Sequence, residues 1–132
     1  LVRSRGLGDV YKRQVLQWLG SNAVLAAMPM VSLGEIQYGI ERLPAGRNRN
    51  SLQLWFEGLL AQYASRILAT DLAVWRTFGR LKASLDTIGR PQEDLDLLIA
   101  ATATVHRLTL VTRNTQHFQD TGIHTFNPWP IT

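Results

Sequence analysis

Apolar residues in the middle of the chain recur at intervals of three and four, the spacing that places side chains on one face of an α-helix. The first such segment follows polar residues 47–50 and carries Leu52, Trp55, Phe56, Leu59, Leu60 and Tyr63. A second predicted helix, capped by Asp71, ends before the break at residues 89–91 and carries Val74, Trp75, Phe78, Leu81 and Leu85. A third, from Asp94 to His106, is apolar around most of its circumference, so we expect it to be buried on most sides.

Short apolar runs between these helices predict buried β-strands. They cover residues 23–31, with an interruption near Pro29, and residues 67–69, 108–111 and 123–126. Further short helices are expected at 15–19, at 115–120 and from Ser32 to the break at 44–46, where Ser32 and Glu35 match a capping box. Strands that alternate with helices imply right-handed parallel crossovers. The expected fold class is therefore α/β, a three-layer α/β/α sandwich around a central parallel sheet.

Length and composition narrow the class of protein. The 132 residues suffice for a single core, and the sequence holds no apolar run long enough to span a membrane. With no cysteine there is no disulfide framework or thiolate zinc site, which fits the cytoplasm as the expected location. The net charge of +4 invites a nucleic-acid interpretation, but residues 1–14 alone contribute most of it, so the rest of the chain is close to neutral.

Residues 1–14 differ from the rest of the chain. They lack an initiating Met, the apolar core of a signal peptide and any helical or strand period. Residues 9–14, Asp-Val-Tyr-Lys-Arg-Gln, are what the codons GAT GTG TAT AAG AGA CAG encode, which resembles the transposon end joined to DNA in sequencing libraries. We expect a non-native or disordered tail at 1–14 and a single domain at 15–132. A natural basic arm is the alternative.

Three polar residues are expected near one edge of the predicted sheet, where α/β proteins bind their substrates. Glu35 follows the first strand, Asn114 follows the strand ending at Val111, and Asp96 opens the buried helix that leads into that strand. Each has an ordinary structural explanation: Glu35 in the capping box, Asn114 as a helix cap, and Asp96 in the favourable field of a helix N-terminus. However, a carboxylate on a helix buried on most sides needs a compensating partner.

Together these oxygen-bearing side chains suggest a site for a hard cation. Mg²⁺ or Mn²⁺ prefers carboxylates, retains water and can activate that water for attack on a phosphate. The histidines His106, His117 and His124 lack a metal-binding spacing, and we interpret them as surface or incidental residues. No Gly-rich phosphate loop, G-x-S-x-G elbow or cysteine nucleophile is present in the sequence, which disfavours nucleotide binding and nucleophilic hydrolysis.

Four ordered motifs carry a family resemblance: V-S-L-G-E-I-Q-Y-G-I at 31–40, D-L-L-I-A-A-T-A at 96–103, L-V-T-R-N-T-Q-H-F at 110–118 and T-F-N-P-W at 125–129. They resemble the motifs of PIN-domain endoribonucleases, the VapC and FitB-like toxins of type II toxin–antitoxin systems. The resemblance implies an Mg²⁺- or Mn²⁺-dependent ribonuclease that is usually dimeric, meets DNA only through its antitoxin and is neutralised by that antitoxin. It carries the family's second acid onto Glu35, the third onto Asp96 and the fourth, variable position onto Asn114.

The family's first acid has no counterpart, because its opening strand, which ends in D-T-N, is missing and Asp9 lies too close to Val15 to replace it. We therefore expect an N-terminally truncated domain with impaired activity, since a lost carboxylate weakens metal binding. Two alternatives stay open: a non-catalytic α/β module that binds RNA or a partner peptide, and a nucleotide-binding signalling domain of flavodoxin-like shape. RNA specificity would come from groove shape and from basic residues such as Arg47, Arg49 and Arg113.

Overall fold

The computed structural model describes residues 26–128, so the expected tail at 1–14, the helix at 15–19 and Trp129 lie outside the described residues. The described helices are α2 (Met30–Glu41), α3 (Arg47–Gln62), α4 (Leu72–Thr87) and α5 (Asp94–His106), with the 3₁₀ turns η2 (Ala64–Arg66) and η3 (Thr115–Phe118). The strands are β1 (Met28–Pro29), β2 (Ile67–Leu68), β3 (Leu110–Val111) and β4 (Thr125–Phe126). The order of helices and strands is that predicted from the sequence.

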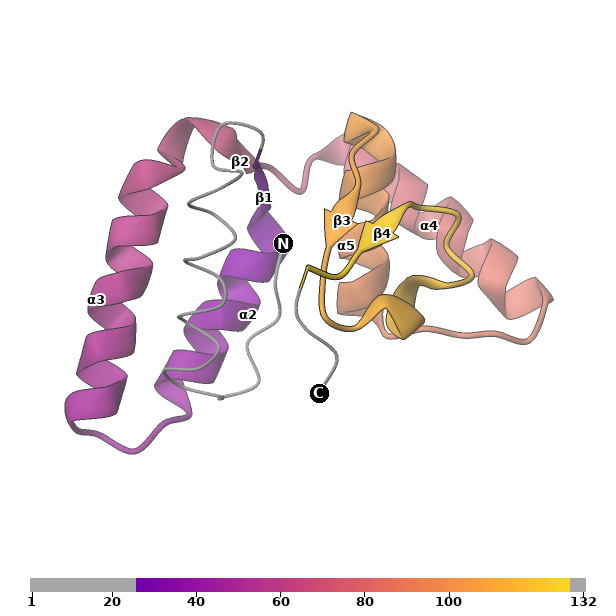
Figure 1. The fold of residues 1–132 in the computed structure, drawn as a ribbon. Helices are drawn as coiled ribbons and strands as arrows, with labels where there is room; N and C mark the ends of the chain where they lie inside the picture. The colour runs from indigo at the N-terminus through magenta and orange to yellow at the C-terminus, as the bar shows by residue number, and fades with distance from the viewer. Residues whose placement is uncertain (1–25, 129–132) are drawn as a thin grey trace.

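Both strand pairs of the described residues are parallel. Met28 of β1 lies opposite Ile67 of β2, and Leu110 of β3 lies opposite Thr125 of β4. Helices α2 and α3 stand on one side of the molecule, and α4 and α5 stand with β3 and β4 on the other (Figure 1). The parallel pairing and the flanking helices confirm the predicted α/β sandwich. No helix of the described residues has both the length and the apolar composition to cross a membrane.

The core forms where α2 meets α5. One cluster of buried side chains joins β1, α2 and α3, and it includes Met28, Ile36, Phe56 and Tyr63. Two further clusters lie along α5, and Val31 of α2 packs against both of them. The side chains of residues 96–103 on α5 are all buried, as expected from the apolar sequence of this helix. Helix α5 thus packs against α2, α4 and η3.

Helices α4 and α5 end in the same way, with one residue in a left-handed conformation. After α4 that residue is Gly89, with φ of 70°, and the N–H of Arg90 donates to the carbonyl of Leu85 at 2.9 Å. After α5 it is Arg107, with φ of 55°, and the N–H of Leu108 donates to the carbonyl of Ala103 at 2.9 Å. Glycine takes this conformation without steric cost, whereas arginine does not.

Some expected boundaries and roles were wrong. The strand expected over 23–31 ends at Pro29, and Met30 and Val31 already belong to α2. The capping box is not formed: Pro29 occupies the N-cap without a side-chain hydrogen bond, and Ser32 lies buried inside the first turn. The helix starts two residues earlier than expected because Pro29 itself marks its start. Residues 47–50, expected to precede α3, form its first turn.

Candidate metal centre

Asp96 is the most buried carboxylate of the described residues, at 2% exposure, and it lies in the first turn of α5. Its Oδ2 atom is 3.3 Å from Nδ1 of His117 on η3. The partner expected for a carboxylate on this buried helix is therefore present. The helix N-terminus adds a favourable field, because its unpaired amide groups carry partial positive charge. Both features offset part of the cost of burying this carboxylate.

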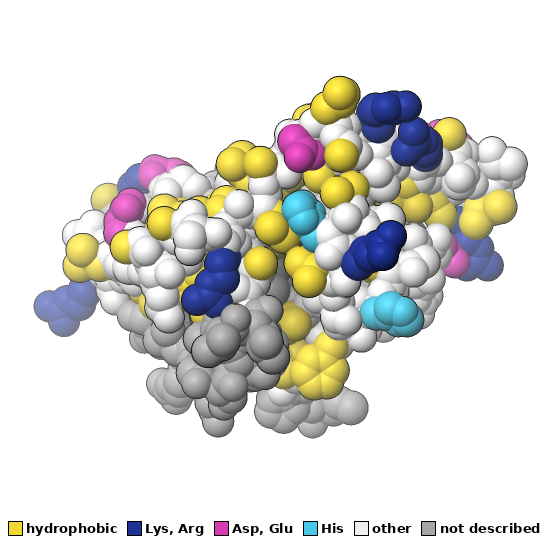
Figure 2. All heavy atoms as spheres, turned by 90° about the horizontal axis from the view of Figure 1, so that it is seen from above, with side chains coloured by type: hydrophobic (Ala, Val, Ile, Leu, Met, Phe, Trp, Pro, Cys, Tyr) yellow, Lys and Arg dark blue, Asp and Glu magenta, His cyan; other side chains and the backbone are white. Residues whose placement is uncertain are grey.

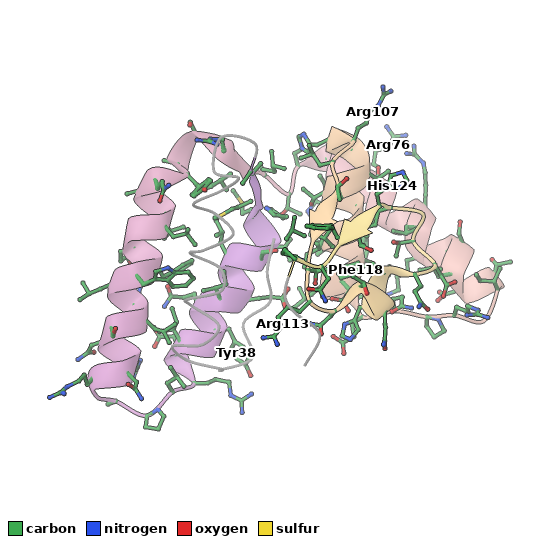
Figure 3. All side chains as sticks on the ribbon, in the orientation of Figure 1. Tyr38, Arg76, Arg107, Arg113, Phe118 and His124 are labelled. Carbon is green, nitrogen blue, oxygen red and sulfur yellow. The ribbon has the colours of Figure 1, made fainter. Side chains whose placement is uncertain are left out.

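His117 corrects an expectation from the sequence, which treated all three histidines as surface or incidental residues. His106 and His124 are exposed as expected, but the side chain of His117 is 34% exposed and contacts Asp96. The signal that could have identified it is its neighbour. Phe118, which is labelled in Figure 3, is 2% exposed and anchors η3 in the cluster that contains Ile99 and Ala100. An apolar anchor of this kind fixes the direction of the adjacent polar side chain.

Glu35 lies on α2, half-buried, with its Oε1 atom shielded from solvent. It follows Val31 by one helical turn, so the two side chains share a face of α2. Val31 packs against the clusters formed by residues 98–101 of α5, and Asp96 lies one turn before those residues. Figure 1 shows that α2 and α5 run in opposite directions. Glu35, one turn after Val31 on α2, and Asp96, one turn before the Val31 contacts on α5, therefore lie toward the same end of the helix pair.

Asn114 precedes η3 and is half-buried, but it does not cap this turn through its side chain as expected. Its main chain provides the local order instead. The N–H of Asn114 donates to Oγ1 of Thr112 at 3.1 Å, and its carbonyl accepts from the N–H of His117 at 3.0 Å. Because His117 contacts Asp96, the turn that begins at Asn114 reaches the first turn of α5. All three predicted site residues are thus carried by elements that converge on this end of α5.

The three arginines considered for RNA binding, Arg47, Arg49 and Arg113, lie in different parts of the structure. Arg113 directly precedes Asn114 and extends from the loop after β3 toward the side of α2, where Tyr38 is also labelled (Figure 3). Arg49 is paired with Glu41 on the surface, and Arg47 is exposed. Seen from above, Lys and Arg side chains are scattered among hydrophobic ones (Figure 2). On this face, charge alone therefore does not mark an RNA-binding groove, and Arg113 is the basic residue adjacent in sequence to the predicted site.

The donor set suits a hard divalent cation. Two carboxylates and an amide oxygen are ligands that Mg²⁺ and Mn²⁺ accept, and Nδ1 of His117 already contacts one of these carboxylates, that of Asp96. Within residues 26–128, no group of three or more His, Cys, Asp or Glu side chains is arranged to hold a metal ion. Mg²⁺ tolerates this, because it is commonly held by one or two carboxylates and keeps several waters. Glu35, Asp96 and Asn114 therefore fit such an ion.

The domain combines parallel strand pairs and flanking helices with a buried carboxylate in the first turn of α5. Comparison with known proteins identifies the family that has this fold. The PIN domain profile matches residues 5–123, so the chain belongs to the PIN domain family. It is 33% identical over 119 residues to VapC ribonuclease Y4jK of Sinorhizobium fredii, covering 89% of this chain and 85% of that protein.

Two further similarities concern one toxin. The chain is 32% identical to Toxin FitB of Neisseria gonorrhoeae, over 88% of this chain and 85% of that protein. Its fold superimposes with a TM-score of 0.80 on a structure of FitAB bound to an IR36 DNA fragment, with 26% identity over 99% of this chain and 96% of that one. The family predicted from the four motifs is thereby confirmed. The boundary expected at residue 14 stays a prediction.

Proposed function

We propose that the chain is the toxin of a type II toxin–antitoxin system and acts as a divalent-metal-dependent endoribonuclease. The observation that carries the proposal is the buried carboxylate of Asp96, fixed by His117 at the start of α5, at the end of the helix pair to which Glu35 also belongs. The names of the relatives, a VapC ribonuclease and Toxin FitB, support the same activity.

In this proposal Glu35 and Asp96 hold Mg²⁺ or Mn²⁺, and the amide oxygen of Asn114 contributes a weaker, uncharged ligand. When bound, the ion supplies a Lewis acid that polarises the phosphate and lowers the pKa of a bound water. The residues of the chain supply the orientation. Asp96 is held by a buried helix, Glu35 by the packing of Val31 one turn away, and Asn114 by its main-chain hydrogen bonds. Arg113 would attract the RNA backbone.

The partners follow from the relatives. FitAB in the similar structure is bound to a DNA fragment, and we propose that this chain likewise binds a small antitoxin and meets DNA only through it. A homodimer is proposed as the form that the antitoxin recognises. Because RNA cleavage in the cell requires access to cytoplasmic RNA, the cytoplasm is the proposed location.

Cleavage of RNA by the purified chain tests the proposal. The chain is incubated with a mixture of transfer, ribosomal and messenger RNA in Mg²⁺ or Mn²⁺, and the fragments are mapped. We expect internal cuts that stop when EDTA is added. Asp96→Asn should lower the rate roughly 100-fold or more, since the loss of one electrostatic contact to the transition state has that effect. Asp94→Asn is the matched control, because Asp94 is exposed in the same helical turn and pairs with Lys82.

If the family's first strand and its acidic residue are missing, as expected from the sequence, the chain should cleave RNA slowly. A chimera that carries the N-terminal segment of the gonococcal toxin in place of residues 1–14 should then cleave faster than the chain itself. Equal rates for the two proteins would contradict the expected impairment. Absence of metal-dependent cleavage by both proteins would contradict the nuclease proposal.

A further inference from the structure

His117 and Asp96 form a contact that the sequence did not predict, and we infer from it that His117 is a positioning residue for the metal centre. Its imidazole would hold the carboxylate of Asp96 in the orientation needed to bind the divalent ion. The inference rests on the proposed function, because it concerns the same ion. It adds to that proposal a residue outside the acidic set, whose role would be exerted through Asp96.

Two neighbouring residues of η3 produce the contact: Phe118 anchors the turn on α5, and His117 reaches Asp96. Phe118 is 2% exposed and packs in the cluster with Ile99 and Ala100. Those two residues lie three and four positions after Asp96, so they are on the same face of α5 as its carboxylate. Anchoring Phe118 there brings the adjacent His117 to Asp96, with Nδ1 3.3 Å from Oδ2. The main-chain hydrogen bond from His117 to Asn114, at 3.0 Å, fixes the turn between them.

The chemistry of the contact suits a metal ligand. An imidazole that donates its Nδ1–H to a carboxylate orients that group and needs no positive charge, so it does not repel a cation. Metal-binding carboxylates are commonly fixed by hydrogen bonds of this kind, which hold the ligand in one rotamer. Asp96 is 2% exposed, so bulk water is poorly placed to supply the same hydrogen bond. His117 is therefore the residue through which the loop after β3 would tune the affinity for the ion.

Two substitutions of His117 distinguish the effect of its N–H donor from the effect of the volume of its ring. His117→Asn keeps an N–H donor near the position of Nδ1, because both nitrogens are bonded to Cγ. His117→Leu removes the donor and keeps a side chain of intermediate size. His124→Leu is the matched control, since His124 is exposed on the loop before β4 (Figure 3). Each protein is titrated with Mn²⁺, and bound ion is measured by electron paramagnetic resonance. Melting in EDTA reports whether the metal-free fold is intact.

We expect His117→Leu to weaken Mn²⁺ binding about 10- to 100-fold, the usual effect of losing the hydrogen-bond partner of a metal ligand. His117→Asn and His124→Leu should bind Mn²⁺ as the parent chain does. Unchanged binding by His117→Leu would overturn the inference and leave the proposed function standing. So would equal losses in His117→Leu and His117→Asn, because the effect would then come from packing. Failure of the parent chain to bind Mn²⁺ would overturn the proposed function together with this inference.

Discussion

The imidazole nitrogen Nδ1 of His117 lies 3.3 Å from the carboxylate oxygen Oδ2 of Asp96, so the loop after β3 is joined to the first turn of α5. The two residues are far apart in sequence and are brought together by the packing of η3 on α5. The site therefore depends on an apolar contact as well as on its acidic residues. Changes to the core beneath η3 should therefore alter metal binding at the proposed site.

Phe118→Ala tests this dependence. The ring is 2% exposed among Ile99, Ala100 and Leu110, so its removal should destabilise the fold by about 3–5 kcal/mol. Urea denaturation would measure the loss, and Mn²⁺ binding under native conditions should weaken in the same variant. Phe126→Ala is the control, because that ring is 52% exposed on β4 and its removal should change stability by about 0.5 kcal/mol or less. Equal losses from the two variants would contradict the role given to Phe118.

Glu35→Gln should lower metal-dependent RNA cleavage by roughly 100-fold, because the amide keeps the size of the side chain but removes the charge that would face the proposed ion. The cleavage rate is measured in the chain or in its chimera, whichever of the two is more active. Glu41→Gln on the same helix is the matched control: Glu41 is exposed and pairs with Arg49. If Glu35→Gln cleaves as fast as Glu41→Gln, Glu35 is not a metal ligand.

Arg107→Gly should stabilise the protein. Arg107 ends α5 with φ of 55°, a left-handed conformation that costs an L-residue with a Cβ atom roughly 1 kcal/mol relative to glycine. Thermal melting should therefore rise for Arg107→Gly and stay near the parent value for Arg107→Ala, since alanine bears the same conformational penalty. A rise of equal size in both variants would mean that the arginine charge, and not the backbone, is responsible.

The ion pair between Lys82 and Asp94 joins α4 to the start of α5, with Nζ 2.8 Å from Oδ1. The hydrogen bond and the negative charge of Asp94 raise the pKa of Lys82 above its ordinary value of 10.5. The folded chain therefore holds this proton more tightly than the unfolded chain. The resulting stabilisation is present below pH 10.5 and is lost as the pH rises through the raised pKa.

Because the pair is exposed to solvent and screened by salt, its contribution should be small. The melting temperature of Lys82→Met should lie slightly below that of the parent chain at neutral pH. The two curves should converge as the pH rises beyond the range in which lysine titrates. A difference that stays constant across this range would show that the effect does not come from the charge of Lys82, whose Nζ lies 5.7 Å from the centroid of the Phe78 ring.

Much of the fold follows from the periodicity of the sequence. Helix α5 runs from Asp94 to His106 as predicted, because its buried apolar residues are bounded by an acidic first turn and by the polar residues after it. Asp71 caps α4 as predicted, with its carboxylate accepting the N–H of Val74 at 3.1 Å. Local chemistry determines both of these boundaries. The start of α2 was misplaced because Pro29 and Ser32 both provide signals for a helix start, and the proline prevailed.

The site was predictable only in part. Asp96 stands out because a charged residue in an apolar helix needs a partner, but that partner lies in a different segment of the chain. Nothing in the spacing of His117 reveals the contact, since its position is set by the packing of Phe118 against α5. The cap expected at Asn114 failed for a similar reason, because its main chain bonds to Thr112 and His117 instead. Tertiary contacts decide the roles of these residues.

The most direct test of the account is whether Asp96 binds a divalent ion. Mn²⁺ titrations of the parent chain, Asp96→Asn and Asp94→Asn would compare two isosteric changes in the same helical turn. The account predicts that Asp94→Asn binds Mn²⁺ as the parent does. Asp96→Asn should bind it more weakly by at least the roughly 10- to 100-fold that losing a ligand's hydrogen-bond partner costs. Equal Mn²⁺ affinity in the parent chain and in Asp96→Asn would contradict the proposed metal centre.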